Sequence, residues 1–196
     1  LGDTPALPTP TQPPAPSPTP TQTNPGGQPG ETFAERYRRL LAASPEFKEG
    51  KDFTFLRKVG DAPIHWACDR DVRIVLRGST PSGAEAALRE VVAAESAASG
   101  LTLGIDVAGP GMAQEGVLTV YFAHLGVTPG HFGINEEQVL GRGGASNFPL
   151  GTRAGEIAMG EVVVRDDVPG YGVTTNAGKE VLAHEIMHAL GIGHSA

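Results

Sequence analysis

Cysteine is almost missing from this 196-residue sequence, which contains only Cys68. A lone cysteine excludes a disulfide within the chain, and in a secreted protein it indicates a partner elsewhere. Long apolar runs are also missing, and no stretch is long enough to span a bilayer. Basic residues are the minority, with 15 Lys and Arg against 22 Asp and Glu and a formal net charge of −7. This acidic balance argues against nucleic acid or an anionic membrane as the main partner.

Aromatic residues are missing from the first 30 positions, which hold a single charged residue, Asp3, and ten of the 17 prolines. Such a segment cannot bury enough apolar surface to offset the entropy of ordering it, so we expect a disordered Pro/Thr-rich linker at 1–30. This composition is typical of a stalk outside the cell, and a disordered end without a role is the alternative. The folded domain is then expected at 31–196. Because the chain begins at Leu1 rather than Met, the lack of a visible signal peptide is uninformative.

Helical and strand patterns alternate after residue 30. Thr32 and Glu35 fit a capping box, which predicts a first helix that stops near Pro45. The next helix is predicted to begin at the N-cap pair Thr80-Pro81 and to stop at Gly100. The remaining predicted elements are strands at 72–78, 101–107, 117–123, 139–146 and 156–164, and a last helix that begins near 174–177.

The order of these elements predicts an α/β fold with a twisted sheet and two main helices. Only one crossover helix lies among the middle strands, so the sheet is expected to be mixed. We expect 139–146 to be an irregular edge strand, whose glycines allow another backbone to approach closely. The stretch 46–71 fits no clear element and is expected to wrap the domain as a loop.

The closing stretch HEIMHALGIGH carries a set of metal-ligand residue types. On a helix, His184 and His188 fall about 40° apart and one turn from each other, so both imidazoles can reach one metal ion. The opposite face carries the apolar residues Leu182, Ile186, Ala189 and Leu190. Gly191 can adopt positive φ and turn the chain back, which lets His194 return as a third ligand. Three neutral nitrogens with one open position describe a catalytic Zn²⁺ site, against the alternative of a hydrogen-bonded histidine cluster.

Glu185 is turned about 100° from His184 along the helix, which puts it beside the metal rather than on it. A general base must stand there to take a proton from metal-bound water. The sequence therefore predicts Glu185 as the catalytic residue.

This motif resembles HExxHxxGxxH, the signature of metzincin zinc metalloproteases, and Ser195 is the residue that matrixins usually carry after it. The order of elements from Val72 to His194 is similar to the upper half of a metzincin domain. Cys68, GRGGAS and GEIAMGEVVV are similar to bacterial secreted matrixin-like proteins. The resemblance covers roughly residues 60–196.

The resemblance implies that His184, His188 and His194 bind zinc, that Glu185 is the general base, and that the strand at 139–146 pairs with an extended peptide or protein substrate. Metzincins continue past the third histidine into a lower subdomain with a methionine-containing turn. All three methionines of this sequence, Met112, Met159 and Met187, come before His194. We therefore expect 31–196 to be a matrixin-like domain that lacks its C-terminal subdomain.

Three other features have weaker functional interpretations. His124 and His131 lie where some matrixins hold a structural metal, but exposed loop histidines are favoured because the matching His-x-Asp arrangement is missing. Asp166-Asp167 could bind Ca²⁺, although a solvated turn is favoured over this unsupported site. Cys68 is expected to have lost a disulfide partner rather than to cap the zinc.

These observations predict a zinc-dependent endopeptidase, secreted or extracellular, or tethered to a surface through its stalk. It would hydrolyse peptide bonds through a zinc-bound water activated by Glu185. The alternative is a non-catalytic zinc-containing binding module on the cell surface. A DNA-linked HExxH protease is disfavoured by the acidic balance, so no nucleic-acid partner and no membrane insertion are expected.

Overall fold

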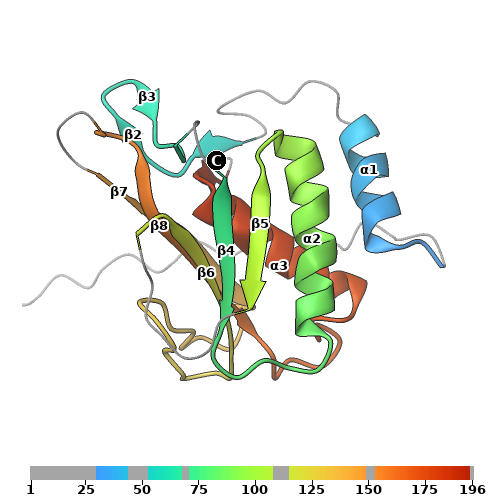
Figure 1. Cartoon of the computed structure of the whole chain (residues 1–196). Coiled ribbons are helices and arrows are strands. Elements are labelled where there is room, and N and C mark those ends of the chain that lie inside the picture. The colour runs from blue at the N-terminus through green and yellow to red at the C-terminus, as the bar shows by residue number, and fades with distance from the viewer. Residues whose placement is uncertain (1–29, 44–52, 68–70, 108–114, 149–152, 195–196) are drawn as a thin grey trace, which may run out of the picture.

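The computed structural model describes residues 30–43, 53–67, 71–107, 115–148 and 153–194, so the predicted linker lies outside the described residues except for Gly30. The elements in chain order are α1 (Phe33–Ala43), β1 (Thr54–Phe55), β2 (Lys58–Val59), β3 (Ala62–Pro63), β4 (Val72–Arg77), α2 (Ala84–Ser99), β5 (Leu103–Val107), β6 (Val117–Ala123), β7 (Gly141–Asn147), β8 (Ile157–Arg165), α3 (Asn176–Ala189) and β9 (Ile192–Gly193) (Figure 1). The predicted mixture of helices and strands is confirmed.

The main sheet has five strands in the order β5-β4-β6-β8-β7. Strands β5, β4, β6 and β8 run parallel to one another, whereas β7 runs antiparallel to β8. The sheet is therefore mixed, and the stretch predicted as an edge strand does lie at one end of it. An irregularity between Ser146 and Asn147 shifts the register of β7 near its end.

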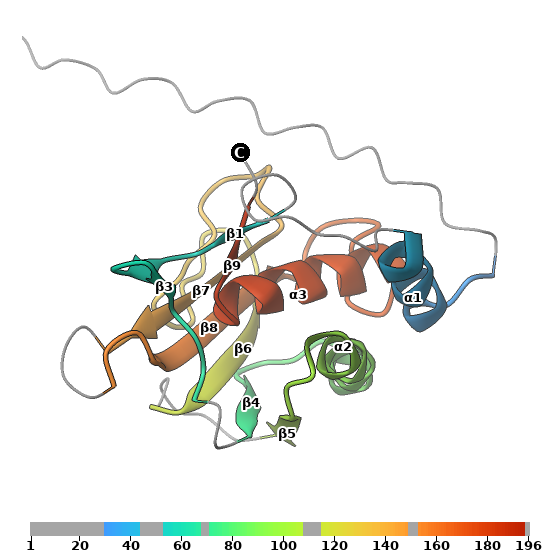
Figure 2. The ribbon, with the colours of Figure 1, turned by 90° about the horizontal axis from the view of Figure 1, so that it is seen from above.

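The helices lie on one side of this sheet, as the view from above shows (Figure 2). Side chains from α2, α3 and alternate positions of β4, β6 and β8 form one core, which Phe33 of α1 joins. The apolar face of α3 that the sequence predicts is buried here, since Leu182, Ile186 and Ala189 have no exposed surface. This packing fixes the direction in which the opposite face of α3 points.

The other face of the sheet holds a smaller core. Successive side chains on a strand point to opposite faces, so Tyr121 and Ala123 face away from the helices and pack with Ile134 and Val163. Glu161 of β8, also buried, accepts a hydrogen bond from Phe132 N–H at 2.7 Å. The connection between β6 and β7 is thereby held against the sheet.

The ends of two helices test the capping predictions. The capping box of α1 forms, with Thr32 N–H donating to Glu35 Oε2 at 2.9 Å. The prediction that α2 begins at Thr80-Pro81 is wrong, because the helix begins at Ala84 after an N-cap glycine, Gly83, with φ 79°. Ala84 N–H bonds to the Pro81 carbonyl oxygen at 3.1 Å, so the Thr80-Pro81 pair belongs to a turn before the helix.

The stretch expected to be a loop contains three short strands. β2 and β3 form a hairpin, and β1 pairs antiparallel with β9, close to the end of the sequence. Trp66 is buried, whereas Phe53 and Phe55 are only partly buried. Sequence patterns missed these strands because two-residue strands carry no periodicity.

None of the helices in the described part of the chain has both the length and the apolar character that crossing a bilayer requires.

Candidate metal centre

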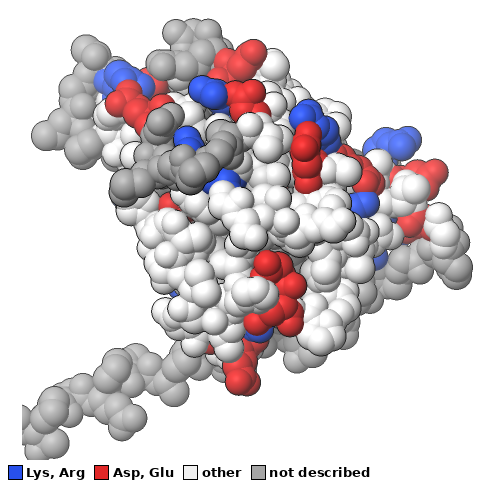
Figure 3. All heavy atoms as spheres, turned by 60° about the horizontal axis from the view of Figure 1, so that its bottom comes forward, with Lys and Arg blue, Asp and Glu red and all other residues white. Residues whose placement is uncertain are grey.

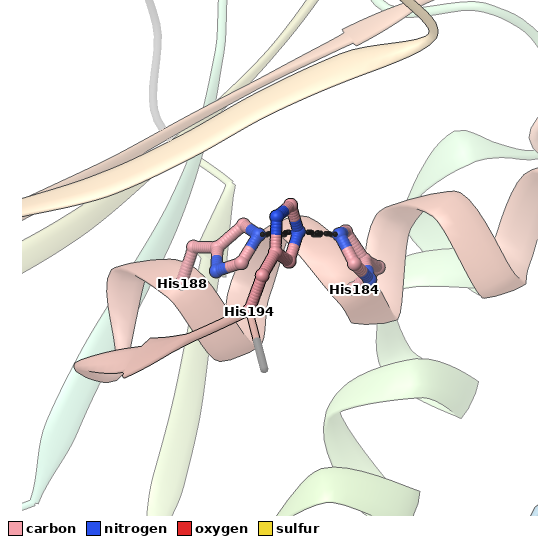
Figure 4. Close-up of side chains that lie close together, drawn as sticks. All are labelled: His184, His188 and His194. Atoms are coloured by element: carbon pink, nitrogen blue, oxygen red, sulfur yellow. Dashed lines mark hydrogen bonds between the residues drawn. The ribbon is translucent and has the colours of Figure 1, made fainter. Parts of the chain in front are cut away.

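Two histidine rings project from one side of α3, one helical turn apart (Figure 4). The Nε2 atoms of His184 and His188 lie 3.1 Å from each other. Both side chains are partly buried, while the opposite face of the helix is fixed in the core. The rings are therefore held in place by the packing of the whole helix.

The third ring returns to them after the helix ends. Helix α3 stops at Ala189, and Gly191 has φ 104°, a backbone conformation that L side chains rarely adopt. This turn brings the Nε2 atom of His194 to 2.9 Å from those of His184 and His188. The structure thus joins all three predicted ligand residues in one cluster that could hold a metal ion.

The protonation of the rings suits metal binding. His188 Nδ1 lies 2.6 Å from the Ile192 carbonyl oxygen, which only accepts, so Nδ1 carries the proton and Nε2 has a free lone pair. Burial, with added repulsion from His188 and His194, lowers the pKa of His184 to about 4. Burial also lowers the pKa of His188. Both rings are therefore neutral near pH 7, the form that coordinates metals.

The spacing of the three nitrogens fits a tetrahedral metal. Zn²⁺–N distances of about 2.0–2.1 Å in a regular tetrahedron separate neighbouring nitrogens by about 3.3–3.4 Å. The observed separations of 2.9 to 3.1 Å are a few tenths of an ångström shorter. Hydrogen bonds alone cannot account for all three contacts between the Nε2 atoms. Each of the three contacts would need its own N–H donor, and His188 Nε2 carries no proton. A cation between them removes this conflict.

Glu185 lies next to His184 in α3 but faces a different element. Its side chain is 8% exposed and packs against β7. Burial raises the pKa of Glu185 to about 7, opposed by the Gly143 N–H and the positive charge of Arg142. An N–H directed at the carboxyl group favours its ionised form, which is the form that a general base needs.

Glycines allow β7 to approach α3 this closely. A Cβ added at Gly143 would lie 2.7 Å from the carbonyl carbon of Glu185 and still closer to the carbonyl oxygen. A Cβ added at Gly141 would lie 2.7 Å from Glu185 Cγ. The sequence correctly predicted a close backbone approach at this strand. It did not reveal that the approaching element is the helix that carries Glu185.

Two residues support the site through long-range contacts that the sequence did not predict. Trp66 Nε1 donates to the Ala189 carbonyl oxygen at 3.1 Å, in a buried position at the end of α3. Thr54 Oγ1 donates to the His194 carbonyl oxygen at 2.6 Å. Contacts across more than a hundred residues leave no local sequence signal, so only the fold reveals them.

The second set of candidates is less suited to a metal. His124, Asp166 and Asp167 offer ligand atoms within 4.8 Å of one another. Arg165 Nε already donates to Asp167 at 2.8 Å and lowers the pKa of its carboxyl group to about 2. His131 is not in this group, and its Nδ1 lies 3.1 Å from Glu161. The Asp167 carboxylate also accepts a hydrogen bond from Leu125 N–H at 3.2 Å, so it is already occupied on both oxygens. Cys68 lies outside the described residues.

No protein-family model matches the chain, and a comparison with curated proteins finds no match.

Proposed function

We propose that this protein is a zinc-dependent endopeptidase of the metzincin type, with a matrixin-like domain. The observation that carries the proposal is the convergence of the His184, His188 and His194 Nε2 atoms within 3.1 Å, next to a buried carboxylate. Three neutral imidazoles with one open side are the ligand set of a catalytic zinc rather than of a closed structural site. His194 is exposed, so solvent and substrate can reach that side of the cluster.

The three histidines would hold the ion, and Glu185 would move the protons. A bound Zn²⁺ supplies Lewis acidity, which polarises a carbonyl and lowers the pKa of a water molecule. Glu185 takes a proton from the attacking water and delivers it to the nitrogen that leaves as an amine. The Gly143 N–H favours the ionised carboxylate and so opposes the rise in the pKa of Glu185 that burial causes.

Strand β7 is suited to bind the substrate backbone. It pairs with β8 along one side and ends the strand order of the main sheet, so its other edge pairs with no strand in the described ranges. An extended peptide that adds to this edge would lie beside Glu185, because Gly141 and Gly143 bring the strand against α3. Main-chain hydrogen bonds of this kind would recognise the extended backbone of a peptide more than its side chains.

The surface charge is compatible with a protein or peptide substrate outside the cell. On the face in Figure 3, acidic and basic side chains of the described residues are interspersed over a largely uncharged surface. Together with the net charge of −7, this disfavours nucleic acid as a partner. Secretion, or tethering through the Pro/Thr-rich segment, is part of the proposal because of that segment's composition.

Zinc analysis and a peptidase assay test the proposal together in the full-length protein. We expect about one equivalent of zinc per chain and cleavage of unfolded proteins or peptide libraries that stops when the metal is chelated. Zinc binding without any cleavage would favour the non-catalytic zinc-containing binding module. A protein that binds no zinc would refute both functions.

A further inference from the structure

The chain immediately after α3 is held by a segment from far upstream. Strand β1 pairs antiparallel with β9, with Thr54 opposite Gly193 and Phe55 opposite Ile192. Leu56 N–H donates to the Gly191 carbonyl oxygen at 2.8 Å. Thr54 Oγ1 donates to the carbonyl oxygen of His194 itself at 2.6 Å. Residues 54–56, which we call the upstream strap, therefore contact each end of the turn that carries the third histidine.

The third histidine needs such support more than the first two. His184 and His188 are positioned by a helix whose other face is buried in the core. His194 lies beyond the end of that helix, is exposed, and follows two glycines within three residues. Glycine has the largest backbone freedom of any residue, so this turn would sample many conformations without external contacts. Ordering it on binding would then reduce the affinity for the metal.

The strap fits this turn closely. A Cβ added at Gly193 would lie 2.8 Å from the side-chain oxygen Oγ1 of Thr54 and 3.3 Å from the backbone nitrogen of Leu56, so a larger residue would displace the strap. On its other side, the Ile192 carbonyl oxygen accepts from His188 Nδ1. The short strand β9 is thus held between a ligand on the helix and the strap.

We propose that the upstream strap positions His194, so that docking of residues 54–56 and binding of the metal stabilise each other. This inference rests on the proposed zinc site and adds Thr54 to it as a positioning residue. Coupling between two binding events is reciprocal. If the strap raises the affinity for zinc, zinc must stabilise the docked strap by the same factor.

The experiment compares Thr54→Val with Thr54→Ser in the full-length protein, with Zn²⁺ affinity measured by competition against a chromophoric chelator. Valine keeps the shape but removes the hydroxyl donor, and serine keeps the donor. Partners that hydrogen-bond the ligating side chains typically contribute about 10–100-fold to metal affinity. Thr54 bonds to the backbone of His194 rather than to its ring, so we expect a loss at the lower end, about 10-fold, for Thr54→Val. Thr54→Ser should change the affinity less than about twofold. Thr102→Val, at an exposed threonine, is the matched control and should bind zinc as tightly as wild type.

Amide hydrogen exchange distinguishes a positioning role from a purely structural one. If Thr54 only stabilised the fold, zinc would not change the exchange rate of the strap. Zinc should slow exchange of the Leu56 amide by a factor similar to the affinity loss of Thr54→Val. Exchange of the Gly100 amide, bonded to Ser96 O at the end of α2, should not change.

The outcomes separate this inference from the proposed function. If wild type binds no zinc, both are wrong. If wild type binds zinc but Thr54→Val binds it equally well, the positioning role is wrong and the zinc site stands. If Thr54→Val fails to fold, the exchange rate of the Leu56 amide is compared in the wild-type protein with and without zinc. A rate that zinc does not alter would overturn the proposed coupling.

Discussion

Replacing Gly143 by alanine tests the contact between the edge strand and the helix that carries the proposed base. The new Cβ would lie 2.7 Å from the carbonyl carbon of Glu185, whereas ordinary contacts begin at 3.4 Å. Strand and helix must therefore separate by roughly 0.7 Å or more. The helix cannot retreat without disturbing Leu182 and Ile186, which are fully buried, and the strand cannot move without straining its pairing with β8.

Overpacking of this kind typically costs 1–3 kcal/mol, and we expect Gly143→Ala to lower the free energy of unfolding by about 2 kcal/mol. For a domain of this size that corresponds to a fall in Tm of roughly 4–8 °C. The assay is denaturant unfolding of the metal-free protein, followed by zinc binding and peptide hydrolysis. Because the strand would move away from Glu185, hydrolysis should fall further than zinc affinity.

Gly104→Ala is the matched control, since Gly104 also lies in an edge strand and an added Cβ there would meet nothing within 4 Å. Alanine at such a site should be neutral or should stabilise the fold by less than about 1 kcal/mol, because it restricts the unfolded chain. If Gly143→Ala were as stable as Gly104→Ala, the close packing of β7 on α3 would be wrong.

Three further predictions concern individual side chains of the site. His188→Ala should abolish stoichiometric zinc binding by metal analysis, while His65→Ala, at an exposed histidine outside the cluster, should retain it; equal zinc in both variants would exclude the site. Glu185→Gln should keep zinc but lower peptide hydrolysis by about 10²–10⁴-fold, because the amide cannot accept a proton, and wild-type activity in this variant would refute the mechanism. Trp66→Phe should lower the free energy of unfolding by about 1 kcal/mol, because it removes the buried hydrogen bond to the Ala189 carbonyl oxygen; unfolding that matches wild type would show that this bond contributes nothing.

The sequence predicted the main elements well where periodicity was strong. The strand at 117–123 has the predicted bounds, and the last helix begins at Asn176 with Thr175 as a side-chain cap, within the predicted range. Alternating apolar residues and a helical histidine pair are local signals. Packing in the core favours the same strands and helix that these signals predict. The mixed sheet followed from the order of these elements, and the edge strand from the glycines at 139–146.

Other features could not be read from local patterns. Thr80-Pro81 is a good start for a helix in isolation, yet the helix begins at Ala84 because Gly83 adopts a left-handed conformation first. An added Cβ at Gly83 would lie 2.6 Å from Thr174 Cγ2, so a tertiary contact favours glycine there. The strap at residues 54–56 is similar, since its partner strand, β9, lies far downstream in the sequence. Both depend on the assembled fold.

The pairing of β1 with β9 also sets an order of events during synthesis. Thr54 and His194 are 140 positions apart, and ribosomes add about 5–20 residues per second. The strap therefore leaves the ribosome roughly 7–28 s before the chain that it contacts. During this interval β4, β5 and β6 emerge and can pair, but neither the strap nor the third histidine has its partner. If the centre binds zinc as proposed, it can do so only after α3 and the turn that carries His194 have emerged.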